Sequence, residues 1–219
     1  MSEENVNISS NEQKTFTDKL RGIFKGVFLP VAKFLTRMGI KPNAVTLAGL
    51  VGHFGAAALA VTGHMTWAGI VILLMAPMDF LDGTMARLRG ESSRFGAFVD
   101  SVTDRYSEFV IMGGLLIYFL IQGNWHGCGA VFLAATGSVM VSYIRSKAEG
   151  LGYEAKIGLL SRVERYIILV PGLVFNFPEY ALWIIGVFAH FTALQRIVSV
   201  RKQAHAEIKN SSIEATQEK

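Results

Sequence analysis

Four of the five aspartates in the chain lie between positions 79 and 104, within a region otherwise rich in apolar residues. They are Asp79, Asp82, Asp100 and Asp104. An ionised carboxylate in a bilayer is costly unless a cation or a water-filled cavity compensates its charge. Four neighbouring carboxylates also repel one another, and bound divalent metal relieves both problems because hard cations take oxygen ligands. Metal held by carboxylates at a membrane surface favours chemistry on a phosphate ester.

The rest of the chain has the composition of a polytopic membrane protein. Charged residues make up 17% of its 219 residues and hydrophobic residues 51%, whereas a soluble domain carries about 25% charged residues. Glycine occurs 22 times, as expected where transmembrane helices pack closely. We therefore predict an all-α integral membrane protein with six transmembrane helices, near residues 45–61, 67–81, 95–121, 130–143, 157–175 and 180–198.

The two ends of the chain differ from this central region. Residues 1–13 are polar, and we expect a disordered tail there. Over residues 14–40, apolar side chains recur near a 3.6-residue period between spaced lysines and arginines, which indicates an amphipathic juxtamembrane helix on the membrane surface. The six spans form one domain over residues 41–200, and residues 201–219 are expected to be a cytoplasmic tail.

Lysine and arginine set the expected orientation. The connections near residues 62–66, 122–129 and 175–180 contain neither residue, so all 21 basic residues fall elsewhere in the chain. Cytoplasmic loops carry the excess of lysine and arginine. Both termini and the turn between the second and third spans are therefore expected to face the cytoplasm, with the protein in the plasma or inner membrane.

The aspartate spacing favours a shared site. On a helix, Asp79 and Asp82 lie on one face, and so do Asp100 and Asp104 on the next helix. The polar turn at residues 88–94 folds the two helices into an antiparallel pair. The four carboxylates are then expected to converge on one or two hard cations.

Residues beside the aspartates fit a phosphate substrate. Gly83 leaves room next to Asp82, and Gly96 permits a close approach of the second helix or of substrate. Arg87 is placed to reach a phosphate bound at the metals. One carboxylate must accept the proton of an attacking hydroxyl. We expect Asp104 to do so because it lies furthest along its span from the cytoplasmic turn.

The spacing Asp-x-x-Asp-Gly-x-x-Ala-Arg, followed after eight residues by Gly-x-x-x-Asp-x-x-x-Asp, resembles the signature of the CDP-alcohol phosphotransferases. Every fixed position is filled, by Asp79, Asp82, Gly83, Ala86, Arg87, Gly96, Asp100 and Asp104. The resemblance covers about residues 20–205. It implies an enzyme that joins a CDP-linked lipid to an alcohol and releases CMP, with Asp104 as the base. It also implies two Mg²⁺ ions, or Mn²⁺, bound by the four aspartates, and a homodimer.

The resemblance also implies a nucleotide site. It places the cytidine nucleotide near Gly83, Arg87 and Ser93 and near the start of the first span. That start carries the other expected contacts for the CDP-lipid, Asn43, Ala44, Val45 and Thr46. The pair Pro42–Asn43 is itself typical of a helix start, where free backbone amides suit an anion.

A second basic cluster bears on the acceptor. It comprises Arg145, Arg162, Arg165 and Arg196, near the expected ends of the fourth, fifth and sixth spans. Such a pocket suits an acceptor that carries its own phosphate; the alternative is a solvated cytoplasmic rim. The arginine after Ser-Tyr-Ile and the Arg162–Arg165 pair resemble family members that join CDP-diacylglycerol to inositol phosphate. Members that accept glycerol 3-phosphate are the alternative, followed by those that accept uncharged or amino alcohols.

Two other classes place aspartates on membrane helices. A membrane prenyltransferase also binds a metal-diphosphate, but the Gly-x-x-Ala-Arg sequence and the short gap between the aspartate pairs do not fit it. A membrane cation transporter is the non-enzymatic alternative, and it would release no CMP from a CDP-lipid. The expected partners are CDP-diacylglycerol, a phosphorylated alcohol, membrane lipid and a second copy of the chain; nucleic acid is not among them.

Overall fold

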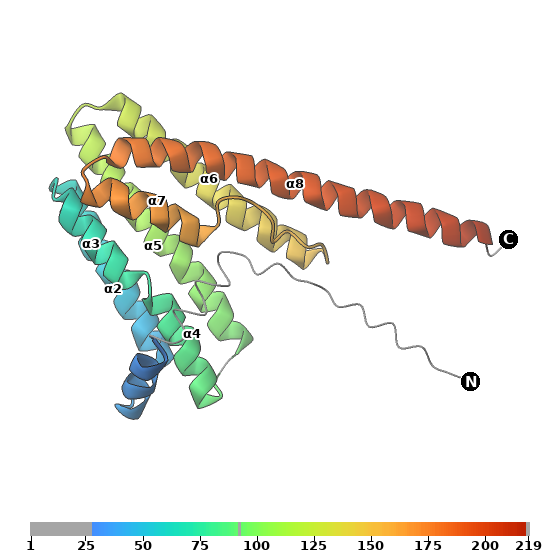
Figure 1. Ribbon diagram of the computed structural model, residues 1–219, viewed down its shortest axis with the longest axis horizontal. Helices are drawn as coiled ribbons and strands as arrows, with labels where there is room; N and C mark the ends of the chain where they lie inside the picture. The colour runs from blue at the N-terminus through green and yellow to red at the C-terminus, as the bar shows by residue number, and fades with distance from the viewer. Residues whose placement is uncertain (1–27, 92, 218–219) are drawn as a thin grey trace.

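The computed structural model describes residues 28–91 and 93–217, with side chains up to residue 209. Within these residues every regular element is a helix (Figure 1), which confirms the predicted all-α class. The polar tail predicted for residues 1–13 and the first part of the predicted juxtamembrane helix, residues 14–27, lie outside the described residues.

Residues 28–37 are helical, and they are followed by α2 (Pro42–Val61), α3 (Met65–Met75), α4 (Met78–Arg89), α5 (Arg94–Ile121), α6 (Trp125–Gly150), α7 (Arg162–Val174) and α8 (Pro178–Gln217). Helix α2 packs against α3, α4 and α5, whereas α8 packs against α6 and α7. Contacts between α3 and α7 and between α5 and α6 join these two groups. The result is one bundle from which the end of α8 projects (Figure 1).

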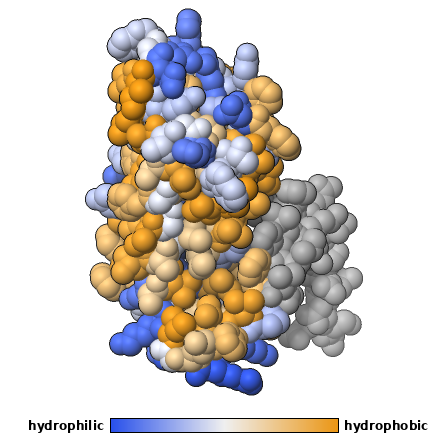
Figure 2. Space-filling model, turned by 90° about the vertical axis from the view of Figure 1, so that its left-hand side faces the viewer, coloured by the Kyte–Doolittle hydropathy of each residue, from blue (hydrophilic) through white to orange (hydrophobic). Residues whose placement is uncertain are grey.

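The surface of the bundle is suited to a membrane. Figure 2 shows a broad hydrophobic band across one face, with hydrophilic residues above and below it. In the part of the chain that the structure describes, four helical segments are long and apolar enough to cross a bilayer: Pro42–Val61, Met65–Arg89, Trp125–Gly150 and Pro178–Lys209. Helix α7 has 13 residues, short of the ~20 that a span needs, and α5 carries several charges in its first half. The number of spans, six, stays a prediction.

A proline divides the second predicted span into two helices. Pro77 has no N–H to continue the helix, and its ring clashes with the carbonyl four residues earlier. Helix α3 therefore ends at Met75, and α4 begins at Met78 with Pro77 as its N-cap residue. The break places Asp79 in the first turn of α4, where the helix dipole favours a negative charge.

The predicted turn between the two aspartate helices is present. Gly90 ends α4 in the left-handed region, at φ 66°, which glycine adopts without strain. Ser93 caps α5, and its hydroxyl accepts a hydrogen bond from the Gly96 N–H at 3.0 Å. These two terminal residues fix where α5 begins relative to α4.

Residues 151–161 lie along α8 and are not helical, so α7 begins at Arg162 and not near residue 157 as predicted. This segment runs antiparallel to α8 and is joined to it by hydrogen bonds. The bonded pairs are Leu160–Thr192, Ile157–Arg196, Glu154–Gln203 and Tyr153–Glu207. The helix rises about 22 Å between residues 192 and 207, and seven extended residues span about 23 Å. The match in length explains why this segment, hereafter the strap, is extended.

Helix α8 is also longer than predicted. It continues through most of the segment expected to be a tail, to Gln217. The strap contacts at Gln203 and Glu207 lie in this extension, so part of it is packed against the chain rather than solvated on all sides.

The helix at residues 28–37 packs on the aspartate-bearing half of the bundle. Ala32 is fully buried in a small cluster with Val45 of α2 and with Leu81 and Met85 of α4. Its opposite side exposes Val31, Phe34 and Met38. Apolar side chains on both sides are typical of a helix between a protein surface and lipid.

One close helix contact gives a test of the packing. An alanine Cβ at Gly114 of α5 would lie 2.8 Å from the carbonyl oxygen and 2.9 Å from the Cα of Ala57 in α2. Because backbone atoms cannot move aside easily, we expect Gly114→Ala to destabilise the protein by about 1–3 kcal/mol, as overpacking typically does. Thermal unfolding in detergent measures this change.

The matched control is Gly113→Ala, since a Cβ at Gly113 meets no atom within 4 Å. It should unfold at or above the wild-type temperature, because alanine favours a helix over glycine. Equal unfolding temperatures for the two variants would contradict the close contact of α2 with α5.

Candidate functional site

Three of the four aspartates meet between α4 and α5. Carboxylate oxygens of Asp79, Asp100 and Asp104 all lie within 4.8 Å of one another. Asp79 comes from the first turn of α4, and the other two come from successive turns on one face of α5. The turn at Gly90 makes this meeting possible because it brings the start of α5 back beside α4.

The fourth aspartate is turned toward α2. Asp82 is buried and accepts a hydrogen bond from the Thr46 hydroxyl. Thr46 in turn lies close to the Pro42 carbonyl, 3.3 Å away. Asp82 therefore lies beside the three-carboxylate group without belonging to it, and the predicted convergence of all four is found for three.

Arg162 places a positive charge between two of the carboxylates. Its Nη1 forms ion pairs with Asp79 and with Asp104. The guanidinium carbon lies 5.4 Å from the centre of the Tyr166 ring, within range of a cation–π contact. The first residue of α7 thus offsets part of the negative charge that α4 and α5 bring together.

The carboxylates fit a hard divalent cation. The Oδ1 atom of Asp100 is buried and accepts no hydrogen bond from any described residue, whereas Oδ1 of Asp104 is paired with Arg162. Buried acceptors without partners are unfavourable, and a cation with oxygen ligands satisfies them. Space is available, because a Cβ at Gly83 would meet only Arg87 Nη1, at 3.7 Å.

A cavity of about 360 Å³ adjoins this group. Its lining includes Asp82 and Asp100 together with five of the residues predicted to hold the CDP-lipid, Asn43, Thr46, Gly83, Arg87 and Ser93. A neighbouring cavity of about 730 Å³ shares Gly83, Arg87 and Asp100 with it and reaches Asp79. These five predicted residues are thus together, and they lie beside the carboxylates.

Two predicted CDP-lipid residues point elsewhere. Val45 is buried in the apolar cluster beneath the first helix. Ala44 is exposed, lines neither cavity and donates its backbone N–H to the Lys41 carbonyl at 3.0 Å. Sequence position alone did not separate them from Asn43 and Thr46, because the four residues occupy one turn of helix whose faces look in different directions.

The four predicted acceptor arginines have different surroundings. Arg145 is exposed and pairs with Glu149 at 2.9 Å, whereas Arg162 forms ion pairs with Asp79 and Asp104. Arg196 is buried and donates to the carbonyls of Ile157 and Val141, at 2.9 and 2.6 Å. Arg165 is also buried and binds Glu108. Arg145 and Arg165 are both close enough to Arg196 for their charges to interact with it.

Several site residues were not predicted. Arg105 lies 3.6 Å from Asp104, and Glu108 holds Arg165. The Tyr166 hydroxyl lies 3.4 Å from Nε2 of the buried His53. Glu108 had a signal in the sequence, because it follows Asp104 by four residues as Asp104 follows Asp100. His53 and Tyr166 had none, since their contact joins positions 113 residues apart.

Comparison with known proteins gives closely related enzymes. The phosphatidylinositol phosphate synthase of Streptomyces avermitilis is 37% identical over 215 residues, covering 90% of this chain and 87% of that protein. The archaetidylinositol phosphate synthase of Pyrococcus horikoshii is 34% identical, with coverage of 84% and 96%.

Solved structures agree with these relatives. Phosphatidylinositol phosphate synthase of Mycobacterium tuberculosis with CDP-DAG bound matches with a TM-score of 0.74 at 29% identity, covering 80% of this chain and 93% of that chain. The same enzyme in complex with manganese and citrate also gives 0.74, with coverage of 79% and 88%.

The family profile described as CDP-alcohol phosphatidyltransferase matches residues 40–195, which include all four aspartates, Gly83 and Arg87. The match spans more than half of the chain, and the relatives extend it on both sides. This protein therefore belongs to the CDP-alcohol phosphatidyltransferase family.

Proposed function

We propose that this protein is a phosphatidylinositol phosphate synthase, which transfers the phosphatidyl group of CDP-diacylglycerol to inositol phosphate and releases CMP. The observation that carries the proposal is the meeting of Asp79, Asp100 and Asp104 beside a cavity lined by Gly83 and Arg87. Family membership supports the transferase chemistry, and the names of the curated relatives support the acceptor.

The reaction requires one bond to form and one to break. A hydroxyl oxygen of inositol phosphate attacks the phosphorus that carries diacylglycerol, and the bond from that phosphorus to the bridging oxygen breaks as CMP leaves. The hydroxyl proton passes to a carboxylate, and we assign this role to Asp104. Its position between Arg162 and Arg105 puts it at the junction of the carboxylate group and the basic cluster.

We assign the metal site to Asp79, Asp82, Asp100 and Asp104, with two Mg²⁺ ions that Mn²⁺ can replace. Bound ions of this kind neutralise the charge of a diphosphate and of the leaving group. The unpartnered Oδ1 of Asp100 supports this assignment, and the related mycobacterial enzyme has been solved in complex with manganese. Asp82 is included because its carboxylate lies in the cavity wall with Asp100.

The CDP-lipid occupies the cavity beside the metals in this proposal. Arg87 is exposed at the cavity and its Nη2 donates to the Thr84 hydroxyl at 3.1 Å, so the guanidinium is oriented from its own helix. It retains other donors for a phosphate oxygen. Asn43, Thr46, Gly83 and Ser93 complete the nucleotide side of the cavity. Val45 packs in the apolar cluster beneath the first helix and does not contact the nucleotide.

The acceptor phosphate binds to Arg165 and Arg196, with Arg145 and Arg162 at the edge of the same cluster. Burial strengthens the case for a ligand, because arginine is rarely buried without a paired charge and Arg196 binds only neutral carbonyl oxygens among the described contacts. Glycerol 3-phosphate is the second candidate acceptor, since its phosphate offers the same chemistry to these arginines.

The proposed topology has six spans, with both termini and the aspartate site on the cytoplasmic side and the first helix along the membrane surface. The connections that lack lysine and arginine join α2 to α3, α5 to α6 and α7 to α8. They therefore lie at the end of each helix remote from the aspartates, as the positive-inside rule requires. We also propose a homodimer, as expected for the family.

Metal binding gives the first test. Mn²⁺ added to the purified protein should bind saturably, as measured by electron paramagnetic resonance, because the carboxylates supply oxygen ligands. Asp79→Asn and Asp100→Asn should each weaken binding by at least about tenfold, since even indirect partners of a metal are worth 10–100-fold. Glu179→Gln is the control, because Glu179 binds Asn124 near the opposite end of the bundle. Full transferase activity in excess EDTA would contradict the metal site.

The acceptor is tested with a panel. Purified protein, CDP-diacylglycerol and Mg²⁺ are incubated with inositol phosphate, glycerol 3-phosphate, inositol or glycerol, and both CMP and the lipid product are measured. We expect inositol phosphate to give the largest kcat/KM, because the arginines recognise a phosphate on the acceptor. A preference for glycerol 3-phosphate would favour the second candidate, and a preference for free inositol would remove the basis for a phosphate site.

The base is tested with Asp104→Asn. The amide has nearly the same shape but cannot accept the hydroxyl proton, and loss of a general base typically costs 10²–10⁴-fold in rate. We expect kcat to fall by about that factor while CDP-lipid binding, measured by calorimetry, is less affected. Wild-type turnover in this variant would place the base elsewhere.

A further inference from the structure

A third carboxylate continues the aspartate face of α5. Glu108 follows Asp104 by four residues, as Asp104 follows Asp100, so the three share one side of the helix. Its side chain is 13% exposed. Glu108 does not join the carboxylates that can hold a metal, and the proposed reaction does not use it.

Glu108 is turned toward the basic cluster. Its Oε1 accepts a hydrogen bond from Arg165 Nε at 2.7 Å, and its Oε2 accepts one from Nη2 at 3.1 Å. A two-point contact of this kind fixes the plane of the guanidinium as well as its position. The pair joins α5, which carries the aspartates, to α7, which carries Arg162 and Arg165.

The contact leaves one end of Arg165 free. The Arg165 side chain is only 4% exposed, and its Nη1 is buried without a hydrogen-bond partner among the described residues. Such an orphaned donor is unfavourable unless a ligand completes it. Arg105 and Arg196 are close enough to Arg165 for their like charges to interact with it, and a bound anion would offset this repulsion.

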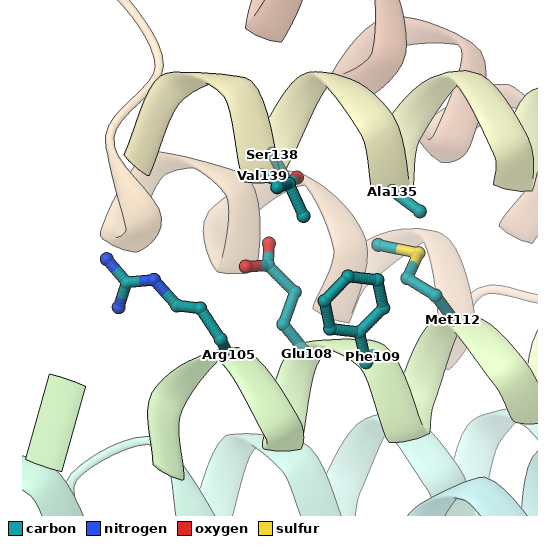
Figure 3. Close-up of a pocket in the computed structure, with 7 residues that line it drawn as sticks. All are labelled: Arg105, Glu108, Phe109, Met112, Ala135, Ser138 and Val139. Atoms are coloured by element: carbon teal, nitrogen blue, oxygen red, sulfur yellow. The ribbon is translucent and has the colours of Figure 1, made fainter. Parts of the chain in front are cut away.

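The surroundings of Glu108 hold it in place. Figure 3 shows its carboxylate directed from α5 toward α6, with Arg105 on one side and the Phe109 ring on the other. The small cavity there is lined on its remaining sides by Met112, Ala135, Ser138 and Val139. Among these lining residues only Arg105 is a cation, and its recorded contacts are with Asp104 and the Ser101 carbonyl.

We propose that Glu108 is a positioning residue, which fixes the Arg165 guanidinium so that its free Nη1 binds the phosphate of the acceptor. This inference rests on the proposed function, in which the basic cluster takes a phosphorylated alcohol. Stability alone is a weak reason for the pair, because a buried ion pair is often no more stabilising than apolar residues of the same volume.

The test uses Glu108→Gln, which keeps the shape of the side chain but loses its charge and one of its two acceptor oxygens. We expect the KM for inositol phosphate to rise about tenfold or more, with kcat and the KM for CDP-diacylglycerol changed by less than about twofold. Glu179→Gln is the matched control, since Glu179 also links two helices, by a 2.7 Å hydrogen bond from Asn124, but lies away from the site. It should leave both KM values unchanged.

Arg165→Gln and the double variant Glu108→Gln/Arg165→Gln complete the experiment. If Glu108 acts through Arg165, the double variant has the same acceptor KM as Arg165→Gln alone. Retained CDP-lipid binding and a wild-type unfolding temperature show that each variant is folded. If Glu108→Gln fails this check, Glu108→Met replaces it in the single and double variants, because methionine fills the same volume without a charge.

The outcomes separate the inference from the function on which it rests. A raised acceptor KM in Arg165→Gln but not in Glu108→Gln keeps the acceptor site and overturns the role of Glu108. Equal losses for both substrates in Glu108→Gln also overturn it, because they indicate a merely structural contact. An unchanged acceptor KM in Arg165→Gln removes the proposed phosphate site itself, and the inference falls with it.

Discussion

Mutual repulsion among carboxylates within an apolar bundle is the constraint on which this structure depends. Asp79, Asp100 and Asp104 are held within 4.8 Å of one another, although separation would lower their electrostatic energy. The fold keeps them together through covalent geometry and packing: Pro77 starts α4 just before Asp79, and the Gly90 turn returns the chain as α5. Among the residues that the structure describes, Arg162 then supplies the one cation that forms ion pairs with two of them.

The positive side of the site is organised differently. The basic cluster comes from α6, α7 and α8, and Arg105 of α5 lies beside it. Most of these arginines have a partner of their own: Glu149 for Arg145, Glu108 for Arg165, and backbone carbonyls for Arg196. Each partner restricts a long side chain that would otherwise have many rotamers. The two halves of the site therefore meet with their charged groups already oriented, which lowers the cost of binding a substrate.

Local spacing explains what the sequence could predict. The aspartate faces, the turn at Gly90 and the helix start at Pro42 depend on residues within a few positions of each other, and each was predicted from such spacing. The direction taken by Asp82 could not be, because Thr46 lies 36 residues away. The same holds for Arg162, whose contact with Asp79 spans 83 residues. The start of α7 was missed for a related reason: residues 157–161 are apolar enough for a helix, but α8 holds the strap extended.

The strap has a consequence for the order in which the enzyme is completed during synthesis. Its hydrogen bonds to α8 join positions 32 to 54 residues apart, so the strap is synthesised before the surface on which it packs. The carboxylates of α4 and α5 have no such delay, because one short turn links them. The carboxylates of α4 and α5 can therefore meet before α8 exists, whereas the strap that leads into Arg162 and Arg165 takes its final path only when the last helix is made.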